Sequence, residues 1–218
     1  PINSFTAVSA SNDITWGNTG EKATAFGAEL EIRKSLFEHE KDSENAVLKN
    51  SLTVGFNAAY MITDQDLDGD KVLTETTEAG FPISFIPTYN NTEISGASNI
   101  VANADISYFK DFSENKSIQL TLAANYFSDR IFALGSVGKG NLIEKGVATL
   151  DFIAKAQLTE NITLGLSAKN LLNPSIERFQ EAVNGDTNQE NDGFQQTDVT
   201  ILSYKRGYDL KLSLAYKF

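Results

Sequence analysis

The sequence predicts an all-β fold, namely an antiparallel transmembrane β-barrel segment of about eight strands. Apolar and polar residues alternate with a period of two along most of the chain, which is the pattern of strands with two different faces. Each alternating segment has about ten residues, enough for a tilted strand to cross a hydrocarbon layer, whereas strands of soluble sandwiches are nearer five or six residues long. The connections alternate between long and short, as they do in outer-membrane barrels.

The composition limits the classes of protein that the chain can belong to. No run approaches the roughly 18 apolar residues of a membrane-spanning helix, which excludes a helical membrane protein. The absence of cysteine excludes disulfides and thiolate sites, and the net charge of −11 argues against nucleic acid as a partner. The chain begins at Pro1 without a signal segment, so we expect a processed protein or a piece of a longer one.

The last alternating segment has the clearest pattern. Its apolar face is aromatic at both ends, as expected of girdles at the two membrane interfaces, and comprises Tyr208, Leu210, Leu212, Leu214, Tyr216 and Phe218. Its other face comprises Asp209, Lys211, Ser213, Ala215 and Lys217. The polar faces of this strand and its neighbours are predicted to line a wet lumen, with the charged residues Asp105, Lys169, Asp209, Lys211 and Lys217.

Seven earlier segments complete the predicted set of strands. In chain order they are 3–11, which alternates weakly, then 26–33, 51–62, 100–108, 118–126, 148–158 and 162–169. Leu, Ile, Phe, Ala or Tyr occupies one face of each, while Thr, Ser, Asn, Gln or charged residues dominate the other face. Each segment is therefore predicted to be a strand with one apolar and one polar side.

The predicted connections indicate an orientation. If Phe218 ends at the periplasm, the outer links 173–200, 129–144 and 63–98 are long and the inner links 159–161 and 111–116 are short, as expected. Two links depart from this rule, because the inner link 35–46 is long and the outer link 12–19 is short. Five of the seven links thus place the C-terminus on the periplasmic side of a bacterial outer membrane.

Four stretches, in order, carry a resemblance to a known family. They are the strand Ala25 to Ile32, the stretch Gly96 to Tyr108, the strand exit Leu166 to Pro174 with Lys169-Asn170-Leu171-Leu172-Asn173-Pro174, and Ser203 to Gly207 leading into the final strand. These stretches resemble the C-terminal barrel portion of TonB-dependent outer-membrane receptors of the Bacteroidetes type. Asn99 stands where that family more often has proline.

The resemblance implies active uptake of a large, scarce solute such as an iron–siderophore, another metal chelate, a vitamin or an oligosaccharide. It implies a barrel of about 22 strands around a plug that the TonB system pulls, so this chain would supply the last eight strands. The implied partners are the remaining strands and plug of the same receptor, the barrel-assembly machinery, and the lipid and lipopolysaccharide of the outer membrane. It also assigns recognition by that machinery to Tyr208, Leu210, Leu212, Leu214, Tyr216 and Phe218.

One local motif suggests a metal ion as a cofactor. The segment 64–75 matches the pattern of a Ca²⁺ loop, with Asp64, Asp66, Asp68, Asp70 and Glu75 as the candidate ligands. Lys71 stands where such loops usually carry an aliphatic residue, and no helices are expected to flank the segment. The alternative is an acidic, solvated loop tip near lipopolysaccharide and its bridging cations.

Three residues in the predicted outer links are candidate contacts to a ligand. Trp16, Arg178 and Phe179 lie in predicted outer links, where an aromatic face or a planar guanidinium could contact a solute, and loop packing is the alternative for each. The lone histidine, His39, is expected in an inner turn and has no evident partners for a metal site or a catalytic triad. The sequence therefore predicts no catalytic residues and no enzyme.

Two further functions remain open beside transport. One is a self-contained eight-stranded barrel with an anchoring or adhesion role, which the strand count allows. Against it, such a barrel needs a strong first strand to pair with the last one, and Asn3 to Ser11 is weak. The other is an outer-membrane enzyme of barrel type, against which the single histidine counts.

Overall fold

The computed structural model describes residues 2–6, 14–18, 20–43, 46–67, 73–76, 80, 82–136, 138–183 and 197–218. In these residues every regular element is a β-strand, and the paired strands run antiparallel. The predicted all-β, antiparallel fold is therefore confirmed. None of the described segments is a helix long and apolar enough to span a membrane.

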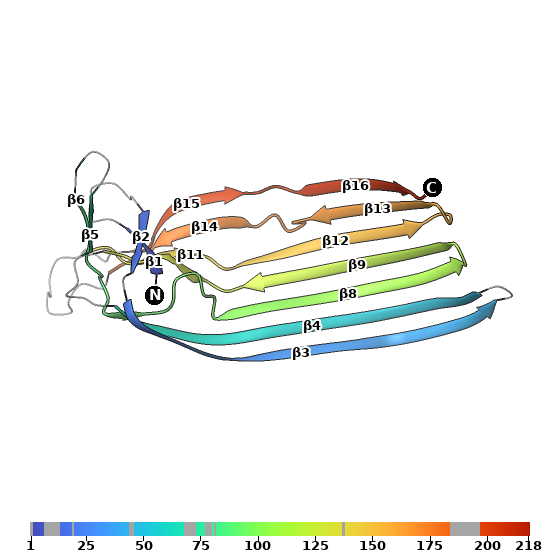
Figure 1. Cartoon of the computed structure of the whole chain (residues 1–218), viewed down its shortest axis with the longest axis horizontal. Helices are drawn as coiled ribbons and strands as arrows, with labels where there is room; N and C mark the ends of the chain where they lie inside the picture. Colours follow the sequence, from blue (N-terminus) through green and yellow to red (C-terminus); the bar gives the residue numbers. More distant parts are fainter. Residues whose placement is uncertain are drawn as a thin grey trace.

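Seven long strands form one sheet, which we call the wall (Figure 1). Its strand order is β16-β13-β12-β9-β8-β4-β3, so neighbours along the chain are neighbours in the sheet apart from the excursions at one end. The strands are β3 (Gly20–Ser43), β4 (Ala46–Leu67), β8 (Ile100–Ser113), β9 (Lys116–Phe127), β12 (Val147–Gln157), β13 (Ile162–Lys169) and β16 (Asp209–Tyr216). The two-residue strand β7 (Asn91–Thr92) also pairs with β4.

The register of the wall puts apolar residues opposite apolar residues in most rows, with an exception on the edge strand β3, where Lys34 pairs with Val54. One such row runs through Ile32, Phe56, Ala104, Ala124 and Leu150. A second row joins Leu122, Phe152, Ala168 and Leu210. Because cross-strand partners lie on the same side of a sheet, the predicted apolar faces merge into one continuous apolar face.

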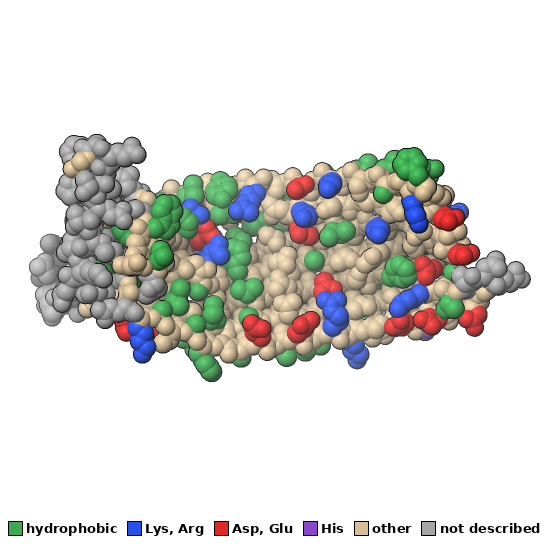
Figure 2. All heavy atoms as spheres, in the orientation of Figure 1, with side chains coloured by type: hydrophobic (Ala, Val, Ile, Leu, Met, Phe, Trp, Pro, Cys, Tyr) green, Lys and Arg blue, Asp and Glu red, His purple; other side chains and the backbone are tan. Residues whose placement is uncertain are grey.

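The polar residues form the opposite face in the same way. Asn57, Asn103, Asn125 and Thr149 form one cross-strand row, and Thr53, Ser107 and Thr121 form part of another. Hydrogen bonds join several members, such as Asn103 Nδ2 to Asn57 Oδ1 at 2.7 Å and the Ser107 and Thr121 hydroxyls at 2.8 Å. Figure 2 shows charged side chains spread over the strands of the wall.

The wall is open, and its two edge strands are β3 and β16. The sheet does not close into a barrel, and it contains seven long strands where about eight were predicted. The difference lies at the amino end, where β1 (Ile2–Thr6) pairs with β2 (Ile14–Asn18) in a separate sheet. Residues 7–11 of the predicted first strand lie outside the described part of the chain.

The apolar face of the wall is uncovered. Phe26 on one edge strand retains 79% of its accessible surface and Leu212 on the other retains 78%. The buried core lies instead at one end of the wall, where Phe5, Leu67, Ile131, Leu134 and Ile143 form a cluster. Thus the wall itself has no hydrophobic core on either side within the described chain.

The hairpin turns lie together at the end of the wall that also holds the C-terminus (Figure 1). The turn between β8 and β9 needs only Glu114 and Asn115, and the turn after β12 occupies residues 158–161, which include the predicted link 159–161. The long inner link predicted for 35–46 is wrong, because β3 continues to Ser43 and β4 begins at Ala46. With this correction the connections at this end are all short.

A β-bulge explains that error. The register shifts between Ser35 and Phe37, so Leu36 is an extra residue and Phe37 stands opposite Leu52 on the apolar face. The shift interrupts the period of two, so the sequence looks irregular although the strand continues. His39 consequently lies in β3 opposite Asn50, not in a turn, and its ring stacks on Phe37 with centroids 5.7 Å apart.

The long connections also contain strands that the sequence reading missed. A second sheet, which we call the extension, has the order β10-β11-β14-β15 and comprises β10 (Arg130–Ala133), β11 (Leu142–Glu144), β14 (Ser175–Gln180) and β15 (Val199–Lys205). Its strands continue the lines of β9, β12, β13 and β16 in the same lateral order (Figure 1). The predicted loops 129–144 and 173–200 therefore begin and end as strands.

The remaining short elements gather at the extension's end of the molecule, beside β1 and β2 (Figure 1). They are β5 (Leu73–Thr76) and β6 (Pro82–Phe85), which pair with each other. β1 is joined to the residues after β10, because Leu134 N donates to Ser4 O and Thr6 N donates to Leu134 O, each at 2.9 Å. Buried Asn3 and Gln65 add a side-chain hydrogen bond of 2.8 Å between β1 and β4.

Candidate functional site

Between the wall and the extension, four pairs of consecutive strands are separated by short interruptions at the same level. The pairs are β9 and β10, β11 and β12, β13 and β14, and β15 and β16. The interruptions comprise residues 128–129, 145–146, 170–174 and 206–208. Asn170, Asn173 and Gly207 have positive φ angles of 59°, 42° and 82°, in the region that asparagine and glycine adopt most readily. The Lys169-to-Pro174 motif is thus a break within a strand line, after which β14 resumes, and not only a strand exit.

Side chains replace the missing ladder hydrogen bonds at this break. Asn170 Nδ2 donates to Gly207 O at 2.6 Å, and Gly207 N donates to Asn173 Oδ1 at 3.0 Å. Gly146 N donates to Asp129 Oδ1 at 2.7 Å, and a Cβ atom on Gly146 would lie 2.5 Å from the carbonyl oxygen of Phe127. These contacts fix the backbone so that the break is a defined structure.

Replacement of Asn170 by alanine is expected to destabilise the break by about 1–2 kcal/mol, because it removes a hydrogen bond and strains a left-handed residue. Asn170→Gly loses the same hydrogen bond without the strain, so its cost is expected to be smaller. Hydrogen exchange of the amides of β14 and β16 measures both effects. Equal protection in the alanine variant and the parent protein would contradict this role.

The break opens a cleft of about 930 Å³ on the polar side of the wall, which we call the polar-face cleft. The wall contributes Thr149, Asp151, Lys169 and Asp209, and the extension contributes residues such as Tyr204. Five basic and three acidic side chains line it: Arg130, Lys145, Lys169, Arg178 and Arg206, and Glu144, Asp151 and Asp209. A chain of net charge −11 therefore has an excess of positive charge at this place.

Arg130, Glu144 and Arg178 form a charged cluster in this cleft, which we call the ion trio. They stand in one cross-strand row of β10, β11 and β14. Glu144 is 7% exposed, and its Oε2 accepts hydrogen bonds from Nε and Nη2 of Arg178 at 3.1 and 2.9 Å. Its Oε1 accepts from Nε of Arg130 at 3.1 Å and also from Nη2 of that residue.

Two aromatic rings hold the guanidinium groups of the ion trio. Arg178 lies over the ring of Phe132 at 3.5 Å, and Arg130 lies over Phe127 at 4.7 Å. Burial by itself raises the pKa of Glu144, but the hydrogen bonds from Arg130 and Arg178 outweigh it and hold that pKa below the ordinary value. One carboxylate thus faces two cations, and the trio carries a net positive charge.

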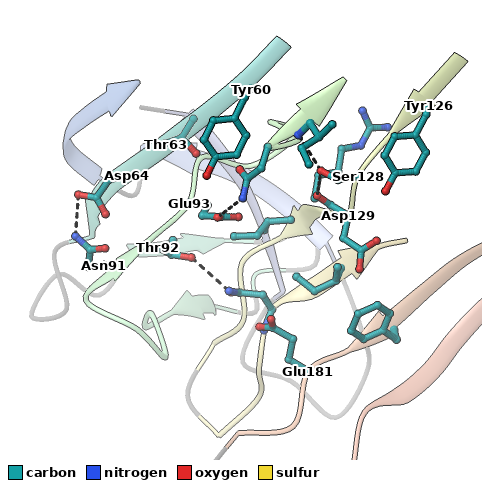
Figure 3. Close-up of a pocket in the computed structure, with 17 residues that line it drawn as sticks. Tyr60, Thr63, Asp64, Asn91, Thr92, Glu93, Tyr126, Ser128, Asp129 and Glu181 are labelled. Atoms are coloured by element: carbon teal, nitrogen blue, oxygen red, sulfur yellow. Dashed lines mark hydrogen bonds between the residues drawn. The ribbon is translucent and has the colours of Figure 1, made fainter. Parts of the chain in front are cut away.

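A second cleft, of about 900 Å³, lies on the other side of the break, and we call it the apolar-face cleft (Figure 3). Tyr60 and Tyr126 border it from the apolar face of the wall, and Asp129 and Glu181 contribute carboxylates. Desolvation raises the pKa of Glu181. Some polar groups of its lining are engaged with each other, as in the hydrogen bond from Asn99 Nδ2 to Glu93 Oε1 at 2.7 Å.

The predicted calcium loop is described only in part. Asp64 and Asp66 lie in β4, where both accept hydrogen bonds from Asn91 Nδ2, at 3.0 and 3.3 Å. Asp68 and Asp70 lie outside the described residues, as does the side chain of Glu75. Within the described part, no three metal-ligating side chains come together, so the Ca²⁺ site stays a prediction.

The structure separates the three predicted ligand contacts. Arg178 and Phe179 are neighbours on β14, but Arg178 lines the polar-face cleft whereas Phe179 lines the apolar-face cleft and packs against the buried core. Trp16 lies in β2 opposite Ser4, is 66% exposed, and lines neither cleft. Arg178 is instead brought together with Arg130 and Glu144, which sequence reasoning had not singled out.

The predicted assembly signal forms the edge of the wall. Tyr208 lies in the break, and the apolar residues from Leu210 to Tyr216 occupy β16, which pairs only with β13 in the described chain. The rings of Tyr216 and Phe218 meet edge to face with centroids 5.0 Å apart. These aromatic residues end the apolar face beside the hairpin turns.

No protein-family model matches the chain, and neither the curated proteins nor the solved structures give a significant match. The described residues themselves define a class of structure. It is an open, antiparallel β-wall with one apolar and one polar face, and with a cationic cleft at the end opposite the hairpin turns.

Proposed function

We propose that the chain forms barrel wall and outer loops of an outer-membrane active-transport receptor. The receptor would take up a large, scarce solute, with energy delivered to its plug by the TonB system. The observation that carries the proposal is the seven-stranded wall with an uncovered apolar face on one side and a polar face on the other. The resemblance of four sequence stretches to TonB-dependent receptors supports the choice of class.

The apolar face fits a lipid environment better than water. Contiguous exposed apolar patches on soluble monomers rarely exceed a few hundred Å². Here Phe26, Leu30, Ile32 and Phe56 on one side and Leu210, Leu212 and Leu214 on the other are all exposed large apolar residues. Alternation of lipid-facing and lumen-facing residues is the pattern of outer-membrane barrels, and aromatic residues such as Tyr60 and Tyr216 would lie near the two interfaces.

The open edges favour a larger barrel over a self-contained one. In hydrocarbon an unpaired edge leaves backbone N–H and C=O groups without partners, at a cost of several kcal/mol for each group. Among the described strands, β3 and β16 are both edges, and β1 pairs with β2 and not with either of them. Further strands of the same receptor would complete the sheet around a lumen lined by the polar face.

The ends of the strands suggest the orientation. Short turns face the periplasm in such barrels and long loops face outward. The hairpin turns and C-terminus would therefore lie at the periplasm, and the extension with its clefts would lie outside, where a solute or lipopolysaccharide is met. Chemistry by this chain is not part of the proposal, because transport needs binding and gating without an enzymatic step.

Cysteine labelling tests the location and orientation, and the chain itself contains no native cysteine. An impermeant maleimide is expected to label Asn90→Cys on intact cells, because Asn90 is exposed in a long connection. Glu114→Cys, in a hairpin turn, is expected to react only after the outer membrane is permeabilised. Labelling of Glu114→Cys on intact cells, or of neither variant in any membrane fraction, would contradict the proposal.

Transport is tested by comparing solute uptake in three strains. Deletion of the gene for the receptor and deletion of the TonB system are expected to abolish accumulation of the same solute from a mixture of metal chelates, vitamins and oligosaccharides. Re-expression of the full-length receptor restores uptake only in the first strain. Unchanged uptake of the whole mixture after deletion of the receptor gene would contradict transport.

The alternative is the self-contained eight-stranded barrel with an anchoring or adhesion role. It requires residues 1–218 alone to refold in detergent into a compact species that resists unfolding by heat on gels. Under the transport proposal this species is not expected, because the outer edges of β3 and β16 pair with no described strand in such a preparation. A heat-modifiable folded monomer would favour the alternative.

Replacement of Phe218 by asparagine is expected to reduce the surface level of the full-length receptor at least several-fold, because the terminal aromatic strand is the proposed recognition signal for assembly. Lys217→Asn, on the polar side of the same strand end, is the matched control and is expected to leave the level unchanged. Surface labelling measures both variants. Equal levels of the Phe218 variant and the parent receptor would refute the signal role.

A further inference from the structure

We propose that the polar-face cleft is a binding site for an anionic solute that carries two or more carboxylate or phosphate groups. The inference rests on the proposed function, because that function places the cleft on the lumen side of the wall near its outer end. It adds the charge of the solute and names the residues that would bind it. Four cations carry the argument: Arg130, Lys169, Arg178 and Arg206.

The ion trio has hydrogen-bonding capacity left for a ligand. Each guanidinium contacts Glu144 through its Nε and Nη2 atoms, so the edge that includes Nη1 is not used by this carboxylate. A planar guanidinium presents donors on more than one edge and can bind an oxyanion in a bidentate way. Glu144 thus positions two arginines while balancing only one of their two charges.

The arginines are fixed before a ligand arrives. Phe132 supports the guanidinium of Arg178 and Phe127 supports that of Arg130, each by a cation–π contact. Side chains that are already ordered lose little entropy when they bind. A structural role alone would be satisfied by one arginine for one carboxylate, whereas the trio keeps an excess cation in a solvent-accessible cleft.

Two further cations extend the positive surface. Lys169 at the end of β13 and Arg206 in the break line the same cleft, and both are exposed. In the described part of the chain neither has a carboxylate within ion-pair distance, although Asp209 is the cross-strand neighbour of Lys169. The other nearby acid, Asp151, accepts a hydrogen bond from Asn170 N at 2.9 Å.

The size and lining of the cleft suggest more than a single small ion. Its volume of about 930 Å³ is near the upper end of small-molecule sites, which span roughly 300–1,000 Å³. Tyr204 and Tyr208 border it and offer flat surfaces next to the cations. A polyanionic solute with a planar or sugar-like body fits this combination of charge and aromatic surface.

Calorimetric titration of the detergent-solubilised full-length receptor tests the site, with citrate and inorganic pyrophosphate as the probes and maltotriose as the neutral comparison. Binding of at least one of the two anions is expected. The double variant Lys169→Gln/Arg206→Gln is expected to weaken it about tenfold or more, since hydrogen bonds to charged groups contribute at this level. Arg178→Lys, which keeps the charge but loses the planar fork, is expected to weaken it as well.

The matched control is Lys155→Gln/Lys205→Gln, which removes the same charge from the polar face and from β15 outside the cleft. This control is expected to change the affinity less than twofold. Equal losses in the two double variants would overturn the site, because they would show a nonspecific charge effect. Absence of binding for both anions, with a correctly folded receptor, would overturn it too.

Lipopolysaccharide could supply phosphate groups to the same cations, so a second titration uses detergent-dispersed lipid A. Competition of pyrophosphate with lipid A at the four cations supports an oxyanion site that a solute can occupy. Binding of lipid A alone would overturn the solute proposal in favour of a lipid contact. These titrations do not depend on transport. Failure of the anion site would therefore leave the labelling and uptake results unchanged, and failure of the transport proposal would leave the titrations unchanged.

Discussion

Under the proposed membrane location, replacement of Leu122 by arginine is expected to destabilise the fold in a bilayer by about 2–4 kcal/mol, the cost of a basic residue on the lipid face near mid-membrane. Leu122 stands on the apolar face of β9 between Ile106 and Phe152. It lies in the interior of the wall, so the expected effect does not depend on which strands complete the sheet. Denaturant titration of the protein in lipid vesicles measures this loss.

The matched control is Ala123→Arg, one residue along the same strand. Ala123 stands on the polar face between Asp105 and Asp151, so an arginine there meets two carboxylates of opposite charge. Its expected effect is within about 0.5 kcal/mol of zero. Similar losses in the two variants, or a larger loss for Ala123→Arg, would be incompatible with a lipid-facing apolar side.

Replacement of Glu144 by glutamine is expected to destabilise the extension by about 2–3 kcal/mol, because it leaves two guanidinium groups together without a countercharge. The estimate is below that for a fully buried pair, since both arginines are partly exposed. Hydrogen exchange of the amides in β10, β11 and β14 measures the loss. Glu177→Gln, whose partner Lys145 is exposed and 3.3 Å away, is the control and is expected to cost less than about 1 kcal/mol.

The lowered pKa of Glu144 gives this contribution a pH dependence. A carboxyl whose pKa is lower in the folded state stabilises the fold fully above its ordinary pKa of about 4.5, and the contribution is lost as the pH falls through the lowered value. The difference between parent protein and Glu144→Gln is therefore expected to be constant above about pH 5 and to shrink below about pH 4. A difference that grows toward low pH would contradict the assigned charge state.

Much of the wall could be predicted because a period of two survives wherever a strand is regular. The apolar rows through Leu122 and Leu212 were assigned to the right faces from alternation alone. The prediction failed where local geometry breaks the period, as at the bulge beside Leu36. It also failed for β10 and β11, whose three or four residues are too few to show an alternation.

The candidate site could be predicted only in part: Arg178 was a predicted ligand contact, but its grouping with Arg130 and Glu144 depends on register between distant strands. Arg130, Glu144 and Arg178 are separated by 14 and 34 residues, and only the pairing of three short strands puts them in one row. The motif containing Asn170 and Asn173 was interpreted as a strand exit, and the break that it forms within a strand line was not predicted. Asparagine and glycine so close to a strand end are a usable signal for a break that allows left-handed residues.

The polar face shows a related limit of sequence reading. Lys169 and Asp209 were assigned correctly to the side opposite the apolar rows, and they are cross-strand neighbours there. Which charged residues collect around a cleft depends on the break, where the extension adds its own cations to those of the wall. The net charge of −11 gave no sign of this local positive excess, because it averages over the whole chain.

The most direct test of a two-faced wall in a membrane is a nitroxide scan of β9 from Ile118 to Asn125. Single cysteines introduced into this cysteine-free chain carry the probe in the protein, which is reconstituted in lipid vesicles. Even-numbered positions are expected to collide with oxygen dissolved in lipid, and odd-numbered positions with a water-soluble nickel chelate, in strict alternation. Equal access of the nickel chelate to both sets of positions would contradict the lipid-facing wall.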